Sequence, residues 1–167
     1  MATVPTDPAD TAGARATPHA RLDLVHFLPY RLSVLSNRVS GAIARMYSDR
    51  FGLGVTQWRV MAVLGQHPGL AATQVAQRTA MDKVAVSRAV GTLIQAGRVQ
   101  RAAHVDDRRR SVLQLTAEGY RVHDEIAPLA LAFEQRVFEG MDASERELLF
   151  RLLDRLDERE IRAEELL

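Results

Sequence analysis

The chain has 167 residues, of which 47% are hydrophobic, 5% aromatic and 26% charged, with a net charge of +1 and no cysteine. This length suits one domain with a sizeable core, and the composition excludes wholesale disorder. The lack of cysteine excludes disulfides, thiolate zinc sites and cysteine-based redox sensing.

No apolar run approaches the roughly 20 residues that a membrane-spanning helix needs. The N-terminus shows no charged region followed by an apolar signal core, so we expect a cytoplasmic protein without membrane contact. Residues 1–21 combine Pro, Gly, Thr, Asp and Ala without an apolar period, and they predict a flexible arm.

The first predicted helix runs from Leu28 to about Arg50, because apolar residues recur along it every three or four positions. Residues 24–27 are expected to form a separate turn before it. Gly52 and Gly54 follow the last apolar position of the pattern and end the helix.

The middle of the chain predicts a run of short helices. Thr56 is expected to cap a helix that ends at the turn over residues 67–69. A one- to two-turn helix follows over residues 73–78, and Asp82 then caps a helix from about Lys83 to Ala96. The last two helices and their tight connection have the spacing of a helix-turn-helix pair.

A β-hairpin is predicted after this pair, because Gly97 closes the helix and two short extended stretches follow it. Residues 98–101 alternate in a way that suits a solvent-facing strand, residues 104–110 form a polar tip, and residues 112–115 supply the returning strand. Thr116 then begins a long helix that we expect to bend at Pro128.

A last helix, capped by Asp142 or Ser144, carries a leucine stripe on one face. Its members are Leu148, Leu149, Leu152, Leu153 and Leu156. Five leucines on one face exceed what the terminal helix of a small monomer needs to bury, so we predict that much of this face is an interface.

The order helix, short helix, turn, helix, hairpin is the layout of a winged helix-turn-helix, whose second helix enters the major groove of DNA. On the predicted helix, Lys83, Ala85, Ser87 and Arg88 lie toward one side and apolar residues toward the other. Lys83 and Arg88 can donate to guanine edges or phosphates, and Ser87 to base or backbone. Val84 or Ala85 can pack against a thymine methyl group.

Two segments resemble the MarR family of regulators: residues 81–88 and residues 107–116. The second fits the family's wing pattern through Asp107, Arg109, Leu113, Leu115 and Thr116. The resemblance covers residues 22–160 and includes the helix order. One departure is the pair Ala71-Ala72, where family members often have a Ser or Thr cap. The helix either starts at Thr73 without such a cap, or is capped by Thr73 and is one or two residues shorter.

The resemblance implies that Arg109 reaches the minor groove while Asp107 orients its guanidinium, with Arg108 and Arg110 available for phosphates. An arginine in a narrow minor groove meets an enhanced negative potential, which agrees with this role. The alternative for these residues is a solvated charged turn. Thr73 is also predicted to contact DNA. The predicted DNA-binding residues are therefore Thr73, Lys83, Val84, Ala85, Ser87, Arg88, Asp107, Arg108, Arg109 and Arg110.

The resemblance also implies a small-molecule pocket near the junction of the dimerisation helices and the DNA-binding lobe, often receptive to aromatic carboxylates or phenols. The candidate residues are His26, Tyr30, Arg31, Ser36 and Trp58. An arginine between aromatic walls can hold such an anion, because its guanidinium gives direction and the rings give apolar contact. Tyr30 and Trp58 also fit ordinary core or interface positions.

The five histidines show no pairing at metal-ligand spacing, and no phosphate-binding loop or nucleophile motif is present. We therefore expect no metal, no cofactor and no enzyme activity. The expected fold is mainly α with a small β-hairpin, a winged helix-turn-helix whose N- and C-terminal helices form a dimerisation region.

The expected domains are a flexible arm (1–21), a dimerisation helix (22–52), a DNA-binding lobe (53–116) and C-terminal dimerisation helices (117–167). The expected function is a bacterial, DNA-binding transcriptional regulator, a homodimeric repressor that a small aromatic carboxylate or phenolic ligand releases from an inverted-repeat operator. The alternative is a helical protein-interaction module without DNA binding.

Overall fold

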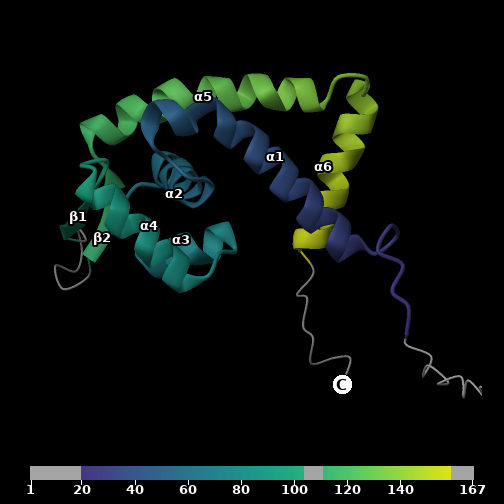
Figure 1. Cartoon of the computed structure of the whole chain (residues 1–167), viewed down its shortest axis with the longest axis horizontal. Coiled ribbons are helices and arrows are strands. Elements are labelled where there is room, and N and C mark those ends of the chain that lie inside the picture. Colours follow the sequence, from purple (N-terminus) through teal and green to yellow (C-terminus); the bar gives the residue numbers. More distant parts are fainter. Residues whose placement is uncertain (1–19, 104–110, 159–167) are drawn as a thin grey trace, which may run out of the picture. The chain divides into compact units, whose positions relative to one another are not determined.

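The computed structural model describes residues 20–103 and 111–158 (Figure 1). Within these ranges the chain forms helices and one antiparallel hairpin, so the prediction of a mainly helical fold with a small hairpin is confirmed. The elements are α1 (Leu28–Phe51), α2 (Val55–Gln66), α3 (Ala72–Thr79), α4 (Lys83–Gln95), β1 (Val99–Ala103), β2 (Ser111–Leu115), α5 (Ala117–Val137) and α6 (Ala143–Asp157).

The chain divides within α1, between Ser36 and Asn37, into an N-terminal unit and a larger unit. In the N-terminal unit a turn precedes α1, as predicted, and Asp23 holds it. The Asp23 carboxylate accepts a hydrogen bond from the Val25 N–H at 3.1 Å and lies 2.7 Å from Nδ1 of His26.

The core of the larger unit lies where α2, α4, the hairpin and the first half of α5 meet. Its fully buried side chains include Val60, Met61, Leu64, Val86, Val90, Leu93, Val99, Leu113, Val122 and Ile126. Each such aliphatic side chain contributes about 1.5–3 kcal/mol when it leaves water. Because α4 supplies several of them, this packing fixes which face of α4 stays outside.

The hairpin is joined to the helices at its base. Val99 pairs with Leu115 and Ala103 with Ser111 across the two strands. An isolated bridge ties β2 to the loop after α2, because the Leu113 N–H donates to the Leu70 carbonyl at 2.8 Å. The hairpin is therefore anchored to the same body that carries α4.

Two predicted helix starts are wrong. α2 begins at Val55 rather than after a Thr56 cap, and α3 begins at Ala72 rather than at or after Thr73. In each case a glutamine in the first turn accepts from the N-cap N–H: Gln57 from Gly54 at 2.9 Å, and Gln74 from Ala71 at 2.8 Å. This half of a capping box lets the helices start without a Ser or Thr hydroxyl at the N-cap.

The first strand also differs from the prediction. β1 starts at Val99, and Val99 is only 2% exposed because it pairs with Leu115 beside α4, so the strand is not wholly solvent-facing. The caps by Asp82, Thr116 and Asp142 are confirmed. Gly97 follows α4 with φ +67°, a left-handed conformation that suits glycine.

Two further predictions concern α5 and the membrane. α5 continues through Pro128, and the bend expected there stays a prediction. Among the described residues, no helix is long and apolar enough to cross a membrane.

Candidate nucleic-acid interface

α4 presents one apolar face to the core and one polar face to solvent. Val86, Ala89, Val90 and Leu93 are buried. Lys83, Val84, Ser87 and Arg88 are exposed, and Ala85 is half-buried at the border. The prediction that one face packs while the other stays free is confirmed. A helix held in this way can offer its polar face to a partner without unfolding.

The start of α4 is fixed by its N-cap and by the turn that precedes it. One carboxylate oxygen of Asp82 accepts from the N–H groups of Val84 and Ala85 at 2.9 and 3.0 Å. Before it, Ala80 has φ +49°, and the Met81 N–H donates to the Ala76 carbonyl at 3.1 Å. These bonds set the sharp connection between α3 and α4 and hold the first turn of α4 in place.

The structure brings together the predicted DNA-binding residues that lie on the helix pair. Thr73 is exposed near the start of α3, and the predicted residues of α4 occupy its first two turns. The wing-tip residues Asp107, Arg108, Arg109 and Arg110 lie outside the described residues. The roles assigned to both sets stay predictions.

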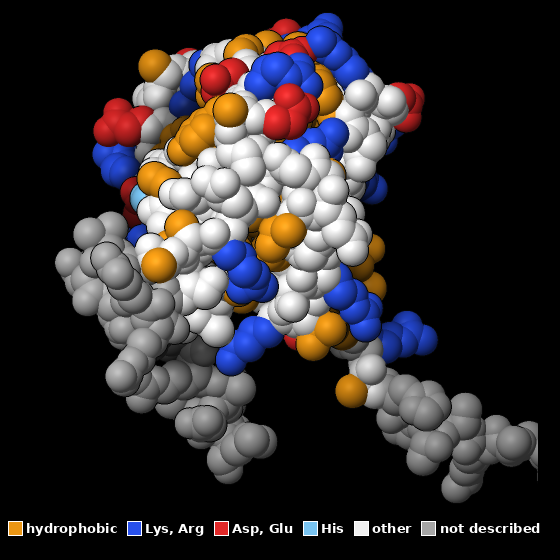
Figure 2. All heavy atoms as spheres, turned by 90° about the vertical axis from the view of Figure 1, so that its left-hand side faces the viewer, with side chains coloured by type: hydrophobic (Ala, Val, Ile, Leu, Met, Phe, Trp, Pro, Cys, Tyr) orange, Lys and Arg blue, Asp and Glu red, His pale blue; other side chains and the backbone are white. Residues whose placement is uncertain are grey.

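Charge is distributed unevenly along the larger unit. Between residues 51 and 103 the sequence has six Lys and Arg but a single acidic residue, Asp82, whereas residues 117–158 hold eleven Asp and Glu against five Arg. In Figure 2 red and blue side chains are mixed in the upper part of the view, whereas the lower part shows blue side chains with little red.

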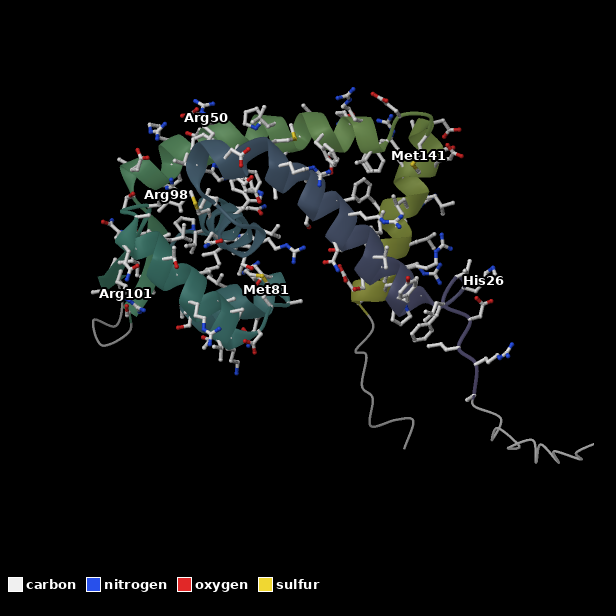
Figure 3. All side chains as sticks on the ribbon, in the orientation of Figure 1. His26, Arg50, Met81, Arg98, Arg101 and Met141 are labelled. Carbon is white, nitrogen blue, oxygen red and sulfur yellow. The ribbon has the colours of Figure 1, made fainter. Side chains whose placement is uncertain are left out.

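Three cations on α4 and β1 make no ion pair within the part of the chain that the structure describes. Within residues 20–103 and 111–158, Lys83, Arg88 and Arg101 have no ion-pair partner. Arg101 lies on β1, farther along the hairpin than Arg98 (Figure 3). Asp82 is occupied as the cap of α4, so this surface is locally basic although the whole chain is almost neutral.

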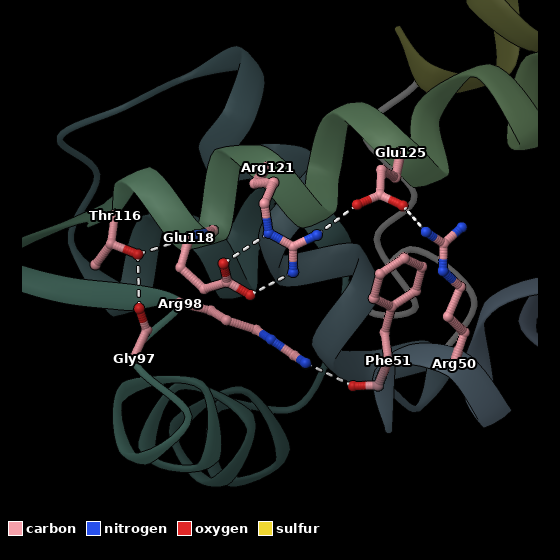
Figure 4. A network of polar contacts seen from close by, with 9 residues as sticks. Arg50, Phe51, Gly97, Arg98, Thr116, Glu118, Arg121 and Glu125 are labelled. Atoms are coloured by element: carbon pink, nitrogen blue, oxygen red, sulfur yellow. Dashed lines mark hydrogen bonds and ion pairs between the residues drawn. The ribbon is translucent and has the colours of Figure 1, made fainter.

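A polar network joins the base of the hairpin to α1 and α5 (Figure 4). The half-buried Arg98 donates from Nη2 to the Phe51 carbonyl at the end of α1, over 2.7 Å. The Thr116 hydroxyl donates to the Gly97 carbonyl at 2.6 Å and accepts from the Gly119 N–H at 3.0 Å. The two ends of the hairpin are thus fixed to neighbouring helices.

The same network continues along α5 as ion pairs. Arg121 donates to both oxygens of Glu118 at 2.8 and 2.7 Å and also pairs with Glu125, which in turn pairs with Arg50 of α1. The hydrogen bonds from Arg121 lower the pKa of the Glu118 carboxyl, and the charge of Arg98 adds to the effect. The carboxylates of Glu118 and Glu125 therefore bind the guanidinium groups of Arg121 and Arg50 next to the base of the hairpin.

Gly119 completes this junction through close approach. A Cβ atom at this position would lie 2.0 Å from the Arg98 carbonyl oxygen. Only glycine lets the first turn of α5 pack directly on the backbone that enters β1.

The predicted ligand-binding residues are divided between the two units. His26, Tyr30, Arg31 and Ser36 belong to the N-terminal unit, and all four are exposed. Trp58 belongs to the larger unit, where its ring lies 5.7 Å from the rings of Tyr47 and of His123. The structure therefore does not gather these five residues into one described site, and their role stays a prediction.

Sequence reasoning missed two arginines and one hollow. Arg98 and Arg101 lie in the stretch predicted as a solvent-facing strand, residues 98–101, and neither belongs to the predicted DNA-binding set. A hollow of about 270 Å³ lies between the first turn of α2 and α4, with Arg88 in its wall. A basic residue directly after a helix-ending glycine was the available signal for Arg98. Within the described part of the chain, no cluster of His, Asp and Glu has the arrangement of a metal site.

Residues 51–110 match the family model of the MarR family. The HTH-type transcriptional regulator BilQ of Clostridium symbiosum is 28% identical over 93 residues, which cover 56% of this chain and 65% of BilQ, just under two thirds of its length. The HTH-type transcriptional repressor Mb2911 of Mycobacterium bovis is 28% identical over 131 residues, covering 78% of this chain and 91% of that protein.

Solved structures agree with the fold. A MarR/EmrR family transcriptional regulator from Acinetobacter sp. ADP1 matches with a TM-score of 0.75 at 25% identity, covering 81% of this chain and 96% of that one. CouR from Rhodococcus jostii RHA1, solved with p-coumaroyl-CoA bound, matches with a TM-score of 0.69 at 25% identity, covering 80% and 91%. The fold of this chain is the winged-helix fold of such regulators.

Proposed function

We propose that this chain, which belongs to the MarR family of transcriptional regulators, binds an inverted-repeat operator in duplex DNA as a homodimeric repressor. In this proposal α4 of each protomer enters the major groove, and the hairpin contacts the flanking minor groove. A small ligand shifts the dimer toward a form that cannot fill both half-sites.

The outward face of α4 carries the proposal. Lys83 and Arg88 stand there without an ion-pair partner among the described residues, within a stretch, residues 51–103, that has a single acidic residue. Free cations on an exposed helix suit a partner that is densely negative, because they neutralise phosphates and release counterions. Ser87 and Val84 between them offer a hydroxyl for a base edge and an apolar contact for a thymine methyl group.

The hairpin supplies the second part of the grip. Arg101 is exposed on β1, and Arg109 with its orienting Asp107 is proposed to enter the minor groove. The network at the hairpin base supports this role, since a wing contributes to affinity only if its orientation relative to α4 is fixed before binding.

Unpaired apolar surface supports a homodimer. No residue of α6 is buried, and Leu148, Leu152 and Leu153 are among its exposed side chains. A groove of about 380 Å³ lies among α1, α5 and α6, lined by apolar side chains with Glu134 as its acidic member. A second copy that covers this surface would remove it from water, as an isologous interface does.

The proposal includes a small-molecule effector. CouR, a structural relative, was solved with p-coumaroyl-CoA bound, an aromatic acyl ligand. For this chain we propose an aromatic carboxylate or phenol, with Arg31 as the anion partner and Tyr30 as an apolar wall. Thermal-shift screening of such compounds tests this class directly.

The DNA-binding proposal is tested by two arginine variants with a matched control. Arg88→Ala and Arg109→Ala should each weaken operator binding by about 1–3 kcal/mol, because each loses a base or groove contact. Both changes should also flatten the dependence of affinity on salt concentration. The measurement is a fluorescence-anisotropy titration of an operator duplex taken from the chain's own promoter region.

Arg136→Ala is the control, because it removes the same charge from an exposed position on α5 that pairs with Glu139. It should leave operator affinity unchanged. If both test variants bind like wild type, the assignment of DNA contacts is wrong. A chain that associates with another protein but retards no duplex would instead support the interaction-module alternative.

A further inference from the structure

The helical glycines of the larger unit differ in what surrounds them. A Cβ at Gly65 would lie 2.6 Å from Nε2 of His123, and a Cβ at Gly119 would lie 2.0 Å from the Arg98 carbonyl oxygen. These two glycines are explained by contacts within the chain. Gly91, inside α4, is not: apart from its own helical backbone and chain neighbours, no described heavy atom lies within 4 Å of its Cβ position.

Gly91 lies on the outward line of α4. Each helical residue advances by about 100°, so Gly91 lies nearly in line with Val84, which is 55% exposed, and with the exposed Gln95. The buried residues Ala89 and Leu93, each two positions and so about 200° away, lie on the opposite side. The middle of the outward face therefore has no side chain, while Ser87 and Arg88 border it.

Glycine at this place has a cost to the fold and no compensation within the described chain. It is among the least favourable residues in a helix interior, where alanine is the most favourable. Gly91 is exposed in the middle of α4, caps nothing and ends nothing. An external surface that comes close to the helix backbone accounts for it.

We propose that Gly91 lets α4 sit deeper in the major groove, with the DNA surface packed directly against its Cα. The inference rests on the proposed function. A helix with its side chains is about 10–12 Å across, and the groove is about 12 Å wide, so a side chain on the outward line limits how far the helix can enter. Deeper entry brings Ser87, Arg88 and Val84 within reach of base edges.

The test is a size series at one position, with folding and binding measured separately. Gly91→Ala and Gly91→Leu both place good helix formers in α4, so both should raise the midpoint of urea unfolding. Operator affinity should fall by about tenfold for Ala and further for Leu, because a larger side chain holds the helix farther from the bases. A change that stabilises the fold and weakens DNA binding is not expected from a structural glycine.

Gly41→Ala is the matched control, because Gly41 is also a helical glycine with open space at its Cβ position, on α1. It should raise the unfolding midpoint, and, where sedimentation shows that the variant is as dimeric as wild type, it should leave operator affinity within about twofold. The inference is overturned if both Gly91 variants bind the operator like wild type, or if Gly41→Ala loses as much affinity as Gly91→Ala. If Arg88→Ala weakens operator binding and the Gly91 variants do not, the role of Gly91 fails alone. If wild type binds no operator, the proposed function fails.

Discussion

At the scale of single residues, Arg98 and Arg101 lie three positions apart but have different surroundings. Arg98 is half-buried, and its guanidinium donates a hydrogen bond to the Phe51 carbonyl. Arg101 is exposed and has no ion-pair partner in the described ranges. Removing the first leaves a helix-end carbonyl without its donor. Removing the second leaves the fold untouched and costs only what an outside partner gained from it.

We predict that Arg98→Met lowers the free energy of unfolding by about 1–3 kcal/mol, because it deletes a hydrogen bond from a charged donor to a half-buried carbonyl. Arg101→Met should stay within about 0.5 kcal/mol of wild type in urea unfolding and should reduce the salt dependence of operator binding. Equal effects of the two variants on stability would show that the structural distinction between them is wrong.

At the scale of secondary-structure elements, the start of α5 is a clamp that holds the end of α4 and the end of α1. Thr116 ties α5 to the end of α4, and the Glu118–Arg121–Glu125–Arg50 chain ties it to the end of α1. The pKa of Glu118 is lowered, chiefly by the hydrogen bonds from Arg121. A lowered pKa means that the carboxylate stabilises the fold above its unfolded pKa and that this stability is lost as the pH falls through the folded value.

Glu118→Gln should therefore reduce the loss of stability on acidification. Above about pH 4.3, the ordinary glutamate pKa, the variant should be less stable than wild type. As the pH falls further the difference should shrink, because wild-type Glu118 is then protonated as well. Urea unfolding at a fixed protein concentration from pH 6 down to pH 3 measures this, and a constant difference at every pH would contradict the clamp.

The elements also show which structural signals the sequence carries. α4 was predictable, because its apolar period and the Asp82 cap are both local and both visible. The starts of α2 and α3 were not, because Gln57 and Gln74 each provide the cap bond from three residues downstream of the N-cap. The burial of Val99 depends on its pairing with Leu115, a contact that no local pattern encodes.

The candidate site also combines features that a local sequence pattern predicts with features that depend on contacts between distant residues. The exposed face of α4 could be predicted from helical periodicity, whereas the anchoring of the hairpin by Arg98 needed a contact between residues that are 47 positions apart. Gly91 was not singled out from the sequence, since only the structure separates a glycine with empty space around it from one that packs against a neighbour.

At the scale of the whole molecule, the part that holds the helix pair and the C-terminal helices carry opposite net charges. The near-neutral total hides a basic stretch over residues 51–103 and an acidic one over residues 117–158. Such a distribution steers a polyanion toward the first and away from the second. It gives the account its central claim, which is that DNA meets this molecule at the outward face of α4.

The most direct measurement is site-directed crosslinking, because the natural chain has no cysteine and a single introduced one is unique. Ser87→Cys on α4 and Ser144→Cys on α6, each labelled with a thiol-reactive photocrosslinker, are irradiated with the operator duplex. The account predicts crosslinks from position 87 to bases of each half-site and none from position 144. Crosslinks from position 144 without any from position 87 would contradict it.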